Sequence, residues 1–181
     1  MKKPIQMSHD FLEEWVTKDS IFVDATVGNG NDTLYFAPLV KKVYAFDIQK
    51  EAISRTQQKL EANGIENVIL IHDGHENVNH YVQDIDAAIF NLGYLPHSDK
   101  KIVTKSSTTL QAIEKIYERL VKGGRIALMV YYGHDGGEEE KDAILQYLST
   151  MDQKQTTVMV YQSLNQVNCP PYLVMIEKLA N

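Results

Sequence analysis

The fold is decided by the stretch Val23-Asp24-Ala25-Thr26-Val27-Gly28-Asn29-Gly30-Asn31-Asp32-Thr33, in which an apolar run passes into a polar, glycine-rich loop. Residues 21–25 predict a buried strand, and residues 31–39 predict a helix that ends near Pro38. A glycine-rich loop between a strand and a helix is typical of nucleotide-binding α/β proteins, because the helix amides attract a carboxylate or phosphate. This stretch therefore predicts a ligand site at the end of the first strand.

Outward from this loop, strands and helices alternate, which predicts a mostly parallel sheet covered by helices on both faces. The other predicted strands are 43–47, 68–72, 87–91, 125–131, 156–162 and 172–177, and the other predicted helices are 10–17, 50–63, 108–121 and 138–148. The helix 108–121 is expected to stop at Gly123-Gly124. The last two strands are joined by a loop too short for a helix, so they are expected to be antiparallel. The prediction is a Rossmann-like α/β fold whose seven-stranded sheet ends in a C-terminal antiparallel hairpin.

Length and composition predict one domain over residues 1–181, because 44 % apolar and 23 % charged residues are the balance of an ordinary globular protein. The apolar runs are much shorter than the roughly 20 residues of a membrane helix, and no apolar signal region follows the N-terminus, so a cytoplasmic protein is expected. The single cysteine, Cys169, excludes an internal disulfide and a multi-thiolate metal site. No metal is expected.

The formal net charge of −6 at pH 7 counts against a broad nucleic-acid-binding surface, because phosphates favour clustered basic residues. It leaves room for a small local patch. Lys100, Lys101 and Lys105 are the candidates for such a patch and are predicted to contact a substrate.

The glycine-rich loop favours S-adenosylmethionine (SAM) over a dinucleotide. A dinucleotide fingerprint requires a third glycine where this chain has Thr33. The polar groups of the loop suit the amino and carboxylate ends of a methionine moiety. An alternative is a polar turn with a helix cap, which explains Asn31 or Asp32 alone better than the whole run. The predicted cofactor residues of this loop are Asp24, Thr26, Gly28, Asn29, Asn31 and Asp32.

Two further strand ends complete the predicted cofactor site. Asp47 ends the second strand 23 positions after Asp24, close to the offset of about 20 residues at which an acid binds a ribose hydroxyl. Ile48 is a candidate apolar wall for adenine and Gln49 a polar neighbour. After the third strand, Asp73, Gly74 and His75 are predicted to border the adenine, although Asp73 also fits a helix N-cap.

The fourth strand ends in Phe90-Asn91-Leu92-Gly93-Tyr94-Leu95-Pro96, which resembles the Asn-Pro-Pro-Tyr signature of methyltransferases that act on amino nitrogens. In those enzymes the amide oxygen and a backbone carbonyl accept hydrogen bonds from the target amine, and the aromatic ring stacks on the base. The match assigns catalytic roles to Asn91 and Tyr94, with Asn91 also beside the cofactor. Leu92, Gly93, Pro96 and His97 are predicted to contact the substrate; a simple turn after a strand is the alternative.

The loop after the fifth strand, Tyr131-Tyr132-Gly133-His134-Asp135-Gly136-Gly137, supplies a candidate general base. His134 lies between glycines on the expected rim of the sheet and would keep an amine neutral. Its alternative is a residue at a helix start without a role. Tyr132 is predicted to contact the substrate. The similar run Asn168-Cys169-Pro170-Pro171-Tyr172 is interpreted as a rigid turn in the hairpin, so carbon methylation through a cysteine nucleophile is disfavoured.

Taken together, these motifs resemble one family from Asp24 to about Gly137: the small bacterial SAM-dependent methyltransferases formerly called rRNA methylases, which include the MnmM-type tRNA wobble-uridine enzymes. The family often has Gly-Gly where this chain has His97-Ser98. The resemblance implies methyl transfer to the amine of 5-aminomethyl-2-thiouridine in the anticodon loop of tRNA, and a homodimer. The motifs are Asp24-Ala25-Thr26, Gly28-Asn29-Gly30, Asp47, Gly74-His75, Asn91–Pro96, Gly133-His134 and Gly136-Gly137.

Other functions remain open from the sequence. An rRNA or small-molecule N-methyltransferase is consistent with the acidic charge, and a non-catalytic SAM-binding protein is consistent with the loop alone. A nicotinamide oxidoreductase is the least favoured, because of Thr33.

Overall fold

The structure is a computed structural model that describes residues 1–92 and 106–180. For residues 106 and 107 it describes the backbone alone. The strands are β1 (Ile21–Asp24), β2 (Lys42–Asp47), β3 (Val68–His72), β4 (Ile85–Leu92), β5 (Leu120–Val130), β6 (Thr156–Tyr161) and β7 (Tyr172–Lys178). The α-helices are α1 (Pro4–Glu13), α2 (Asn31–Phe36), α3 (Lys50–Ala62), α4 (Ser106–Arg119) and α5 (Gly137–Ser149). Two 3-10 helices are η1 (Ala37–Leu39) and η2 (His75–His80).

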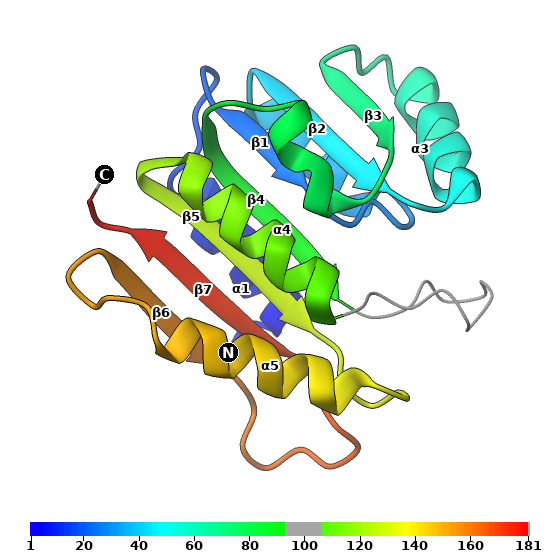
Figure 1. Ribbon diagram of the computed structural model, residues 1–181. Helices are drawn as coiled ribbons and strands as arrows, with labels where there is room; N and C mark the ends of the chain where they lie inside the picture. The colour runs from blue at the N-terminus through cyan, green and yellow to red at the C-terminus, as the bar shows by residue number, and fades with distance from the viewer. Residues whose placement is uncertain (93–105, 181) are drawn as a thin grey trace.

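The strands form one seven-stranded sheet in the order β3-β2-β1-β4-β5-β7-β6 (Figure 1). Neighbours from β3 to β5 are parallel, whereas β7 is antiparallel to both β5 and β6. The chain winds outward from β1 in one direction and from β4 in the other, so the winding reverses between these two strands. This topology confirms the predicted sheet, and ligands of such sheets bind beyond the carboxyl ends of the strands at this switch point.

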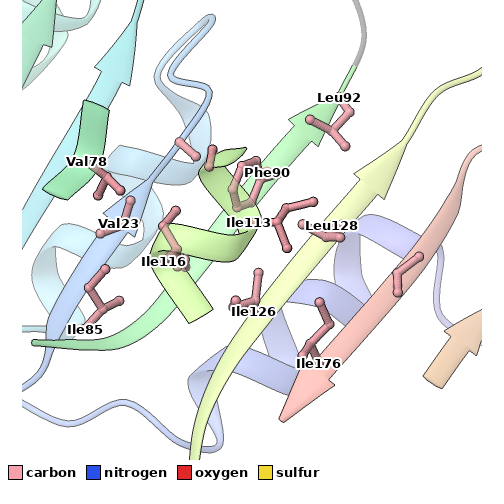
Figure 2. Close-up of a cluster of buried hydrophobic side chains, with 14 of the residues drawn as sticks. Val23, Val78, Ile85, Phe90, Leu92, Ile113, Ile116, Ile126, Leu128 and Ile176 are labelled. Carbon is pink, nitrogen blue, oxygen red and sulfur yellow. The ribbon is translucent and has the colours of Figure 1, made fainter. Parts of the chain in front are cut away.

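The sheet is covered on both faces, and each face has its own core. Phe90 in β4 packs with Ile113 and Ile116 of α4, and Ile85 and Val78 belong to the same cluster (Figure 2). On the other face, the second core joins α1 to the middle of the sheet and contains Leu12, Phe22, Phe36, Ala87, Ile89, Ala127 and Met129. Alternate residues of β4 and β5 therefore face α1, and the same alternation carries on to Asn91 and Tyr131 at the ends of these strands.

The first helix differs from its prediction. It spans Pro4–Glu13 rather than 10–17, with Pro4 in its first turn. Pro is favoured there because its fixed φ suits a helix and its missing N–H is not needed. Ser8 and Leu12, one helical turn apart, are buried against the sheet. The face of this helix that packs on the sheet thus begins before residue 10, where the helix was predicted to start.

The junction of α4 and β5 also differs from its prediction. The helix ends at Arg119, and Gly123-Gly124 lie within β5 instead of terminating the helix. Leu120 already pairs with Ile85, and the register shifts before Arg125 pairs with Ala87. Both glycines are tightly placed, since a Cβ on Gly123 would lie 2.4 Å from the Trp15 ring and one on Gly124 would lie 2.8 Å from a backbone oxygen. The presence of two glycines here is therefore explained by close packing inside β5 and not by the end of a helix.

Within the described part of the chain, no helix is long and apolar enough to cross a membrane.

Candidate active site

The carboxyl ends of β1, β2 and β4 converge through hydrogen bonds between the predicted site residues. The Asn91 N–H donates to Oγ1 of Thr26 at 2.6 Å, which ties the end of β4 to the β1 loop. The Gly28 N–H donates to the Asp47 carboxylate at 2.8 Å, which ties the same loop to the end of β2. The sequence predicted these residues separately, and the structure brings them together at one rim.

The glycine-rich loop has the backbone that a close ligand approach requires. Gly28 and Gly30 have φ of 53° and 76°, a left-handed conformation that side chains rarely adopt. A Cβ on Gly30 would lie 2.6 Å from Oγ1 of Thr56 in α3. In dinucleotide-binding loops a third glycine allows close packing of the helix that follows. In this chain the close packing is at Gly30, against Thr56 of α3, and the third position carries the side chain of Thr33.

Asp24 and Thr33 stabilise the glycine-rich loop through side-chain hydrogen bonds. The Asp24 carboxylate is fully buried and accepts hydrogen bonds from the Thr26 N–H at 3.1 Å and the Thr33 hydroxyl at 2.6 Å. Burial, together with the nearby negative charge of Asp32, raises the pKa of Asp24 to about 7. The partners of Asp24 lie in the loop and in the first turn of α2, so its observed contacts hold the loop against the helix.

Asp47 presents its carboxylate at the end of β2. One oxygen accepts from Gly28 and the other from the Gln49 N–H at 2.9 Å. Each carboxylate oxygen has a second lone pair, so this group can still accept from two ribose hydroxyls. Ile48, which was predicted as an adenine wall, is an exposed apolar side chain beside it. The geometry at β2 suits a ribose with an apolar neighbour.

Asp73 and His75, at the end of β3, have partners within the protein. The Asp73 carboxylate accepts from the Gly74 N–H, from Asn77 and from the Tyr81 hydroxyl. Partial burial opposes its ionisation, but these hydrogen bonds outweigh that effect and lower the pKa of Asp73. Asp73 therefore supports η2 through these contacts, but the N-cap residue of η2 is Gly74 rather than Asp73.

His75 is buried, and its Nδ1 lies 2.9 Å from the Ala25 carbonyl oxygen. A carbonyl only accepts, so Nδ1 carries the hydrogen. Burial lowers the pKa of His75 and favours this neutral form. The ring is adjacent to Phe90, with centroids 5.5 Å apart. These contacts make His75 a support for the end of β1, and its predicted contact with adenine stays a prediction.

The two loop asparagines differ. The Asn29 side chain accepts a hydrogen bond from Arg55 at 2.7 Å, and its carbonyl accepts one from Lys59, both on α3. Asn31 is exposed at the start of α2. The observed side-chain contact of Asn29 thus turns towards α3, whereas Asn31 stays accessible at the rim.

Asn91 is held by Asp32, and Asp32 is held by a residue that the sequence analysis missed. The Asn91 side-chain N–H donates to one Asp32 oxygen, and His9 Nε2 lies 2.6 Å from the other. A carboxylate can only accept, so the amide nitrogen of Asn91 must face Asp32. Its Oδ1 therefore points away from Asp32 and is the acceptor end of the group. This arrangement can receive a hydrogen bond from an amine.

Two neighbouring tyrosines after β5 lie on opposite faces of the sheet. Tyr131 continues the alternation of Ala127 and Met129, and burial together with the charge of Asp32 raises the pKa of Tyr131. The Tyr132 ring packs instead in the α4 core, 5.7 Å from the Tyr172 ring, with Lys141 4.8 Å from its centroid. The alternation therefore places Tyr131 on the same face as Asn91, and the predicted contact of Tyr132 with the substrate stays a prediction.

His134 lies in a turn closed by the hydrogen bond from the Gly137 N–H to the His134 carbonyl. Its ring packs on Gly137, where a Cβ would come within 2.9 Å of it, and its Nε2 is inaccessible to solvent. Cys169 of the hairpin loop adjoins Gly133. The role of His134 as a general base stays a prediction, because the hydrogen bond between a general base and its substrate often forms only in the complex.

The remaining predicted residues lie outside the described part of the chain; they are the catalytic candidate Tyr94 and the substrate candidates Gly93, Pro96, His97, Lys100, Lys101 and Lys105. Leu92 is buried at the end of β4. His9 and Tyr131 are the additions that the structure makes. No sequence signal links His9 to the site, whereas Tyr131 could have been found from the alternation of Ala127 and Met129. Among the described residues, no cluster of His, Cys, Asp and Glu could hold a metal ion.

The fold and this rim define a class I SAM-dependent methyltransferase. The sheet order, the glycine-rich loop after β1 and the acid that ends β2 are the elements that such an enzyme uses to bind its cofactor. Residues 43–177 match the family described as "Putative rRNA methylase", and the chain belongs to that family.

Several relatives agree. The Arabidopsis thaliana protein named "tRNA (mnm(5)s(2)U34)-methyltransferase, chloroplastic" is 36 % identical over 98 % of this chain and 70 % of its own length. A "putative methyltransferase" from Streptococcus mutans, solved in complex with SAH, is 57 % identical with a TM-score of 0.95 over 99 % of both chains. A "putative rRNA-methylase" from Clostridium thermocellum is 45 % identical with a TM-score of 0.97 over 99 % of both chains. SAM is thus the methyl donor.

Proposed function

We propose that this methyltransferase transfers the methyl group of SAM to the amino nitrogen of 5-aminomethyl-2-thiouridine at the wobble position of tRNA, giving 5-methylaminomethyl-2-thiouridine. The name of the Arabidopsis thaliana relative supports the substrate. The observation that carries the proposal is the Asn91 amide, which Asp32 orients with its oxygen as an acceptor. An acceptor at the end of β4 suits an amine that must present its lone pair to a methyl group.

The cofactor residues divide into those that contact SAM and those that shape its site. We assign the ribose to Asp47, each of whose oxygens keeps a spare lone pair, and the methionine end to the backbone of Gly28 and the helix start at Asn31 and Asp32. Asp24, Thr26 and His75 support the loop through the hydrogen bonds described above. Gly30 fits this cradle because a side chain there would meet Thr56.

SAM supplies a sulfonium-bound methyl group, which passes to the amine nitrogen as the carbon–sulfur bond breaks and a thioether remains. The protein's part is to position the amine and to keep its lone pair unprotonated. Asn91 Oδ1 accepts one N–H of the amine and so directs the lone pair. The nitrogen releases one proton after transfer, and His134 is our candidate to receive it. We assign the stacking of the base to Tyr94.

The test uses purified protein, SAM and tRNA from cells that lack this methylation step, followed by mass spectrometry of the nucleosides. We expect 5-aminomethyl-2-thiouridine to be converted to its methylated form. The free nucleoside and rRNA are incubated in parallel. Methylation of either of these without tRNA conversion would replace the proposal with a small-molecule or rRNA N-methyltransferase. Binding of SAM with no transfer to any of them would also contradict it.

Replacing Lys100, Lys101 and Lys105 together with alanine tests the proposed tRNA contact. We expect tRNA affinity to fall and its salt dependence to become shallower, because each lost phosphate contact removes counterion release. Unchanged affinity would place the basic patch elsewhere. A homodimer, which the family resemblance implies, remains a proposal that sedimentation would test.

A further inference from the structure

His9 connects the first helix to the centre of the proposed site. Its side chain is 19 % exposed, and its Nε2 lies 2.6 Å from an oxygen of Asp32, whose side chain is 10 % exposed. The ring stacks on Tyr35 with centroids 4.2 Å apart and meets Phe36 edge-on at 5.3 Å. Stacking on one side and an edge contact on the other fix the plane of the imidazole, so Nε2 is aimed at Asp32.

The Asp32 carboxylate divides its oxygens between two donors. His9 occupies Oδ1 and the Asn91 side-chain N–H occupies Oδ2. A carboxylate that lost one donor could rotate to compensate, because terminal carboxylate torsions are broad. Rotation would release the Asn91 amide or turn it over, and its Oδ1 would no longer be the acceptor end. The orientation of Asn91 therefore depends on a residue that does not touch it.

We infer that His9 is a positioning residue for methyl transfer: it locks the Asp32 carboxylate, and Asp32 in turn holds the Asn91 amide with its oxygen towards the acceptor amine. The inference deepens the proposed function and rests on it for the identity of the amine. The chain of contacts itself, from α1 through α2 to β4, is a feature of the structure.

Docking of α1 does not account for His9, because the helix has other anchors. Arg125 donates to the Phe11 carbonyl at 2.8 Å and to Glu14 at 2.9 Å, and Tyr161 donates to the Lys2 carbonyl at 2.7 Å. Leu12 is fully buried in the core below. The Arg125 contacts hold the C-terminal part of α1, near the start of β5, and the Tyr161 contact holds the chain just before the helix. Among the described contacts of α1, only that of His9 reaches a group that touches Asn91.

The variants His9→Ala and His9→Gln test the inference, with Glu14→Gln as the matched control. Glutamine places an N–H donor where Nε2 lies, whereas alanine removes it. Glu14→Gln weakens an anchor of α1 that is remote from Asn91. We expect His9→Ala to lower kcat for tRNA methylation by roughly tenfold to a hundredfold, because misplacement by about 1 Å has effects of that size. The Kd for SAM should stay within about threefold, and His9→Gln should recover most of kcat.

A purely structural His9 would give a different result. It would lower the melting temperature in both His9 variants and leave kcat of the folded fraction unchanged, or it would affect kcat equally in Glu14→Gln. Either outcome overturns the inference. If wild-type protein methylates tRNA and His9→Ala does so equally well, the proposed function stands and the role of His9 fails.

A second measurement does not depend on the substrate. The side-chain amide protons of Asn91 can be followed by nitrogen-15 NMR in the wild type and the three variants. We expect their resonances to shift and to exchange faster with solvent in His9→Ala, and to stay in place in His9→Gln and Glu14→Gln. Unchanged Asn91 resonances in His9→Ala would overturn the inference even if the natural acceptor proved to be another amine.

Discussion

The rim formed by β1, β2 and β3 differs from the rim formed by β4 and β5 in how its polar groups are held. In the first rim, Asp24, Asp47 and Asp73 accept hydrogen bonds from backbone amides of their own or an adjoining loop. In the second rim, Asn91 is held by side chains that come from distant parts of the chain. The polar groups of the first rim, to which we assign the cofactor, are thus held largely by backbone amides, whereas those of the second, to which we assign the acceptor, are held by side chains from distant parts of the chain.

Asp47→Ala should have the largest effect and should fall on the cofactor rim alone. It removes both the proposed ribose acceptor and the partner of the Gly28 N–H. We expect SAM affinity, measured by calorimetry, to fall by at least about a hundredfold, since each hydrogen bond to a charged group contributes about 1.5–3 kcal/mol. The exposed Asp84, at the opposite end of the sheet, provides the control Asp84→Ala. Equal affinity in wild type and Asp47→Ala would mean that the ribose binds elsewhere.

Asn91→Ala should lower methyl transfer and leave the binding of SAM nearly unchanged. Methyl transfer should drop by about a hundredfold through lost positioning of the amine, while SAM affinity changes by less than about threefold. Rapid-quench measurement of a single turnover, combined with calorimetry, distinguishes the two effects. The control is Asn63→Ala at the end of α3. A variant that lost SAM binding in step with transfer would show that the two rims are not separable.

The raised pKa of Asp24 predicts how the cofactor rim responds to pH. A buried acid whose folded pKa of about 7 exceeds its ordinary value of 3.8 binds its proton more tightly when folded. Its contribution to stability is therefore present at low pH and is lost as pH rises from about 4 through 7. We expect Asp24→Asn, which keeps a neutral group there, to gain stability relative to wild type over this range, by a few kcal/mol at most.

Thermal unfolding at a series of pH values measures this effect, with the exposed Asp84→Asn as the control. A difference between wild type and Asp24→Asn that does not vary between pH 4 and 8 would show that the carboxyl is ionised in the folded protein at all these pH values.

The variants Gly30→Ala and Gly64→Ala distinguish the cost of a positive φ from the cost of a steric clash with a neighbouring side chain. Both positions have positive φ, but a Cβ on Gly64 meets nothing within 4 Å and one on Gly30 meets Thr56. Gly64→Ala should lower the free energy of unfolding by about 1–2 kcal/mol through the left-handed backbone alone. Gly30→Ala should lower it by about 1–3 kcal/mol more through overpacking.

Adding Thr56→Ala to Gly30→Ala should recover the second part of that loss, as measured by urea unfolding. Equal losses at Gly30 and Gly64, with no recovery from Thr56→Ala, would contradict the packing role of Gly30 against α3.

The same contrast explains what the sequence could predict. The strand ends and the loop from Asp24 to Asp32 were predicted because their chemistry is local and follows period-two and period-3.6 patterns. The bounds of β3 agree with the prediction at both ends. The acceptor rim could not be predicted in the same way. His9 contacts Asp32 across 23 positions, and Asn91 contacts it across 59. The packing of α1 on the sheet brings His9 to Asp32, and the pairing of β4 with β1 brings Asn91 there.

Local patterns also failed where packing overrode them. The Gly123-Gly124 pair has the composition of a helix stop, yet contacts with Trp15 and Leu120 place it inside β5. The predicted substrate contact of Tyr132 stays a prediction, and Tyr131, which was not predicted, continues the alternation of Ala127 and Met129. The register of β5 against β4, in which Met129 pairs with Asn91, relates this alternation to the end of β4.

The central claim is methyl transfer to an amine of the wobble base, and two synthetic anticodon stem-loops test it most directly. One carries 5-aminomethyl-2-thiouridine at the wobble position, and the other carries 2-thiouridine and is otherwise identical. With SAM bearing a deuterated methyl group, we predict that the label appears on the amino nitrogen of the first stem-loop and not in the second. Label in both stem-loops, or in neither while SAM is bound, would contradict the account.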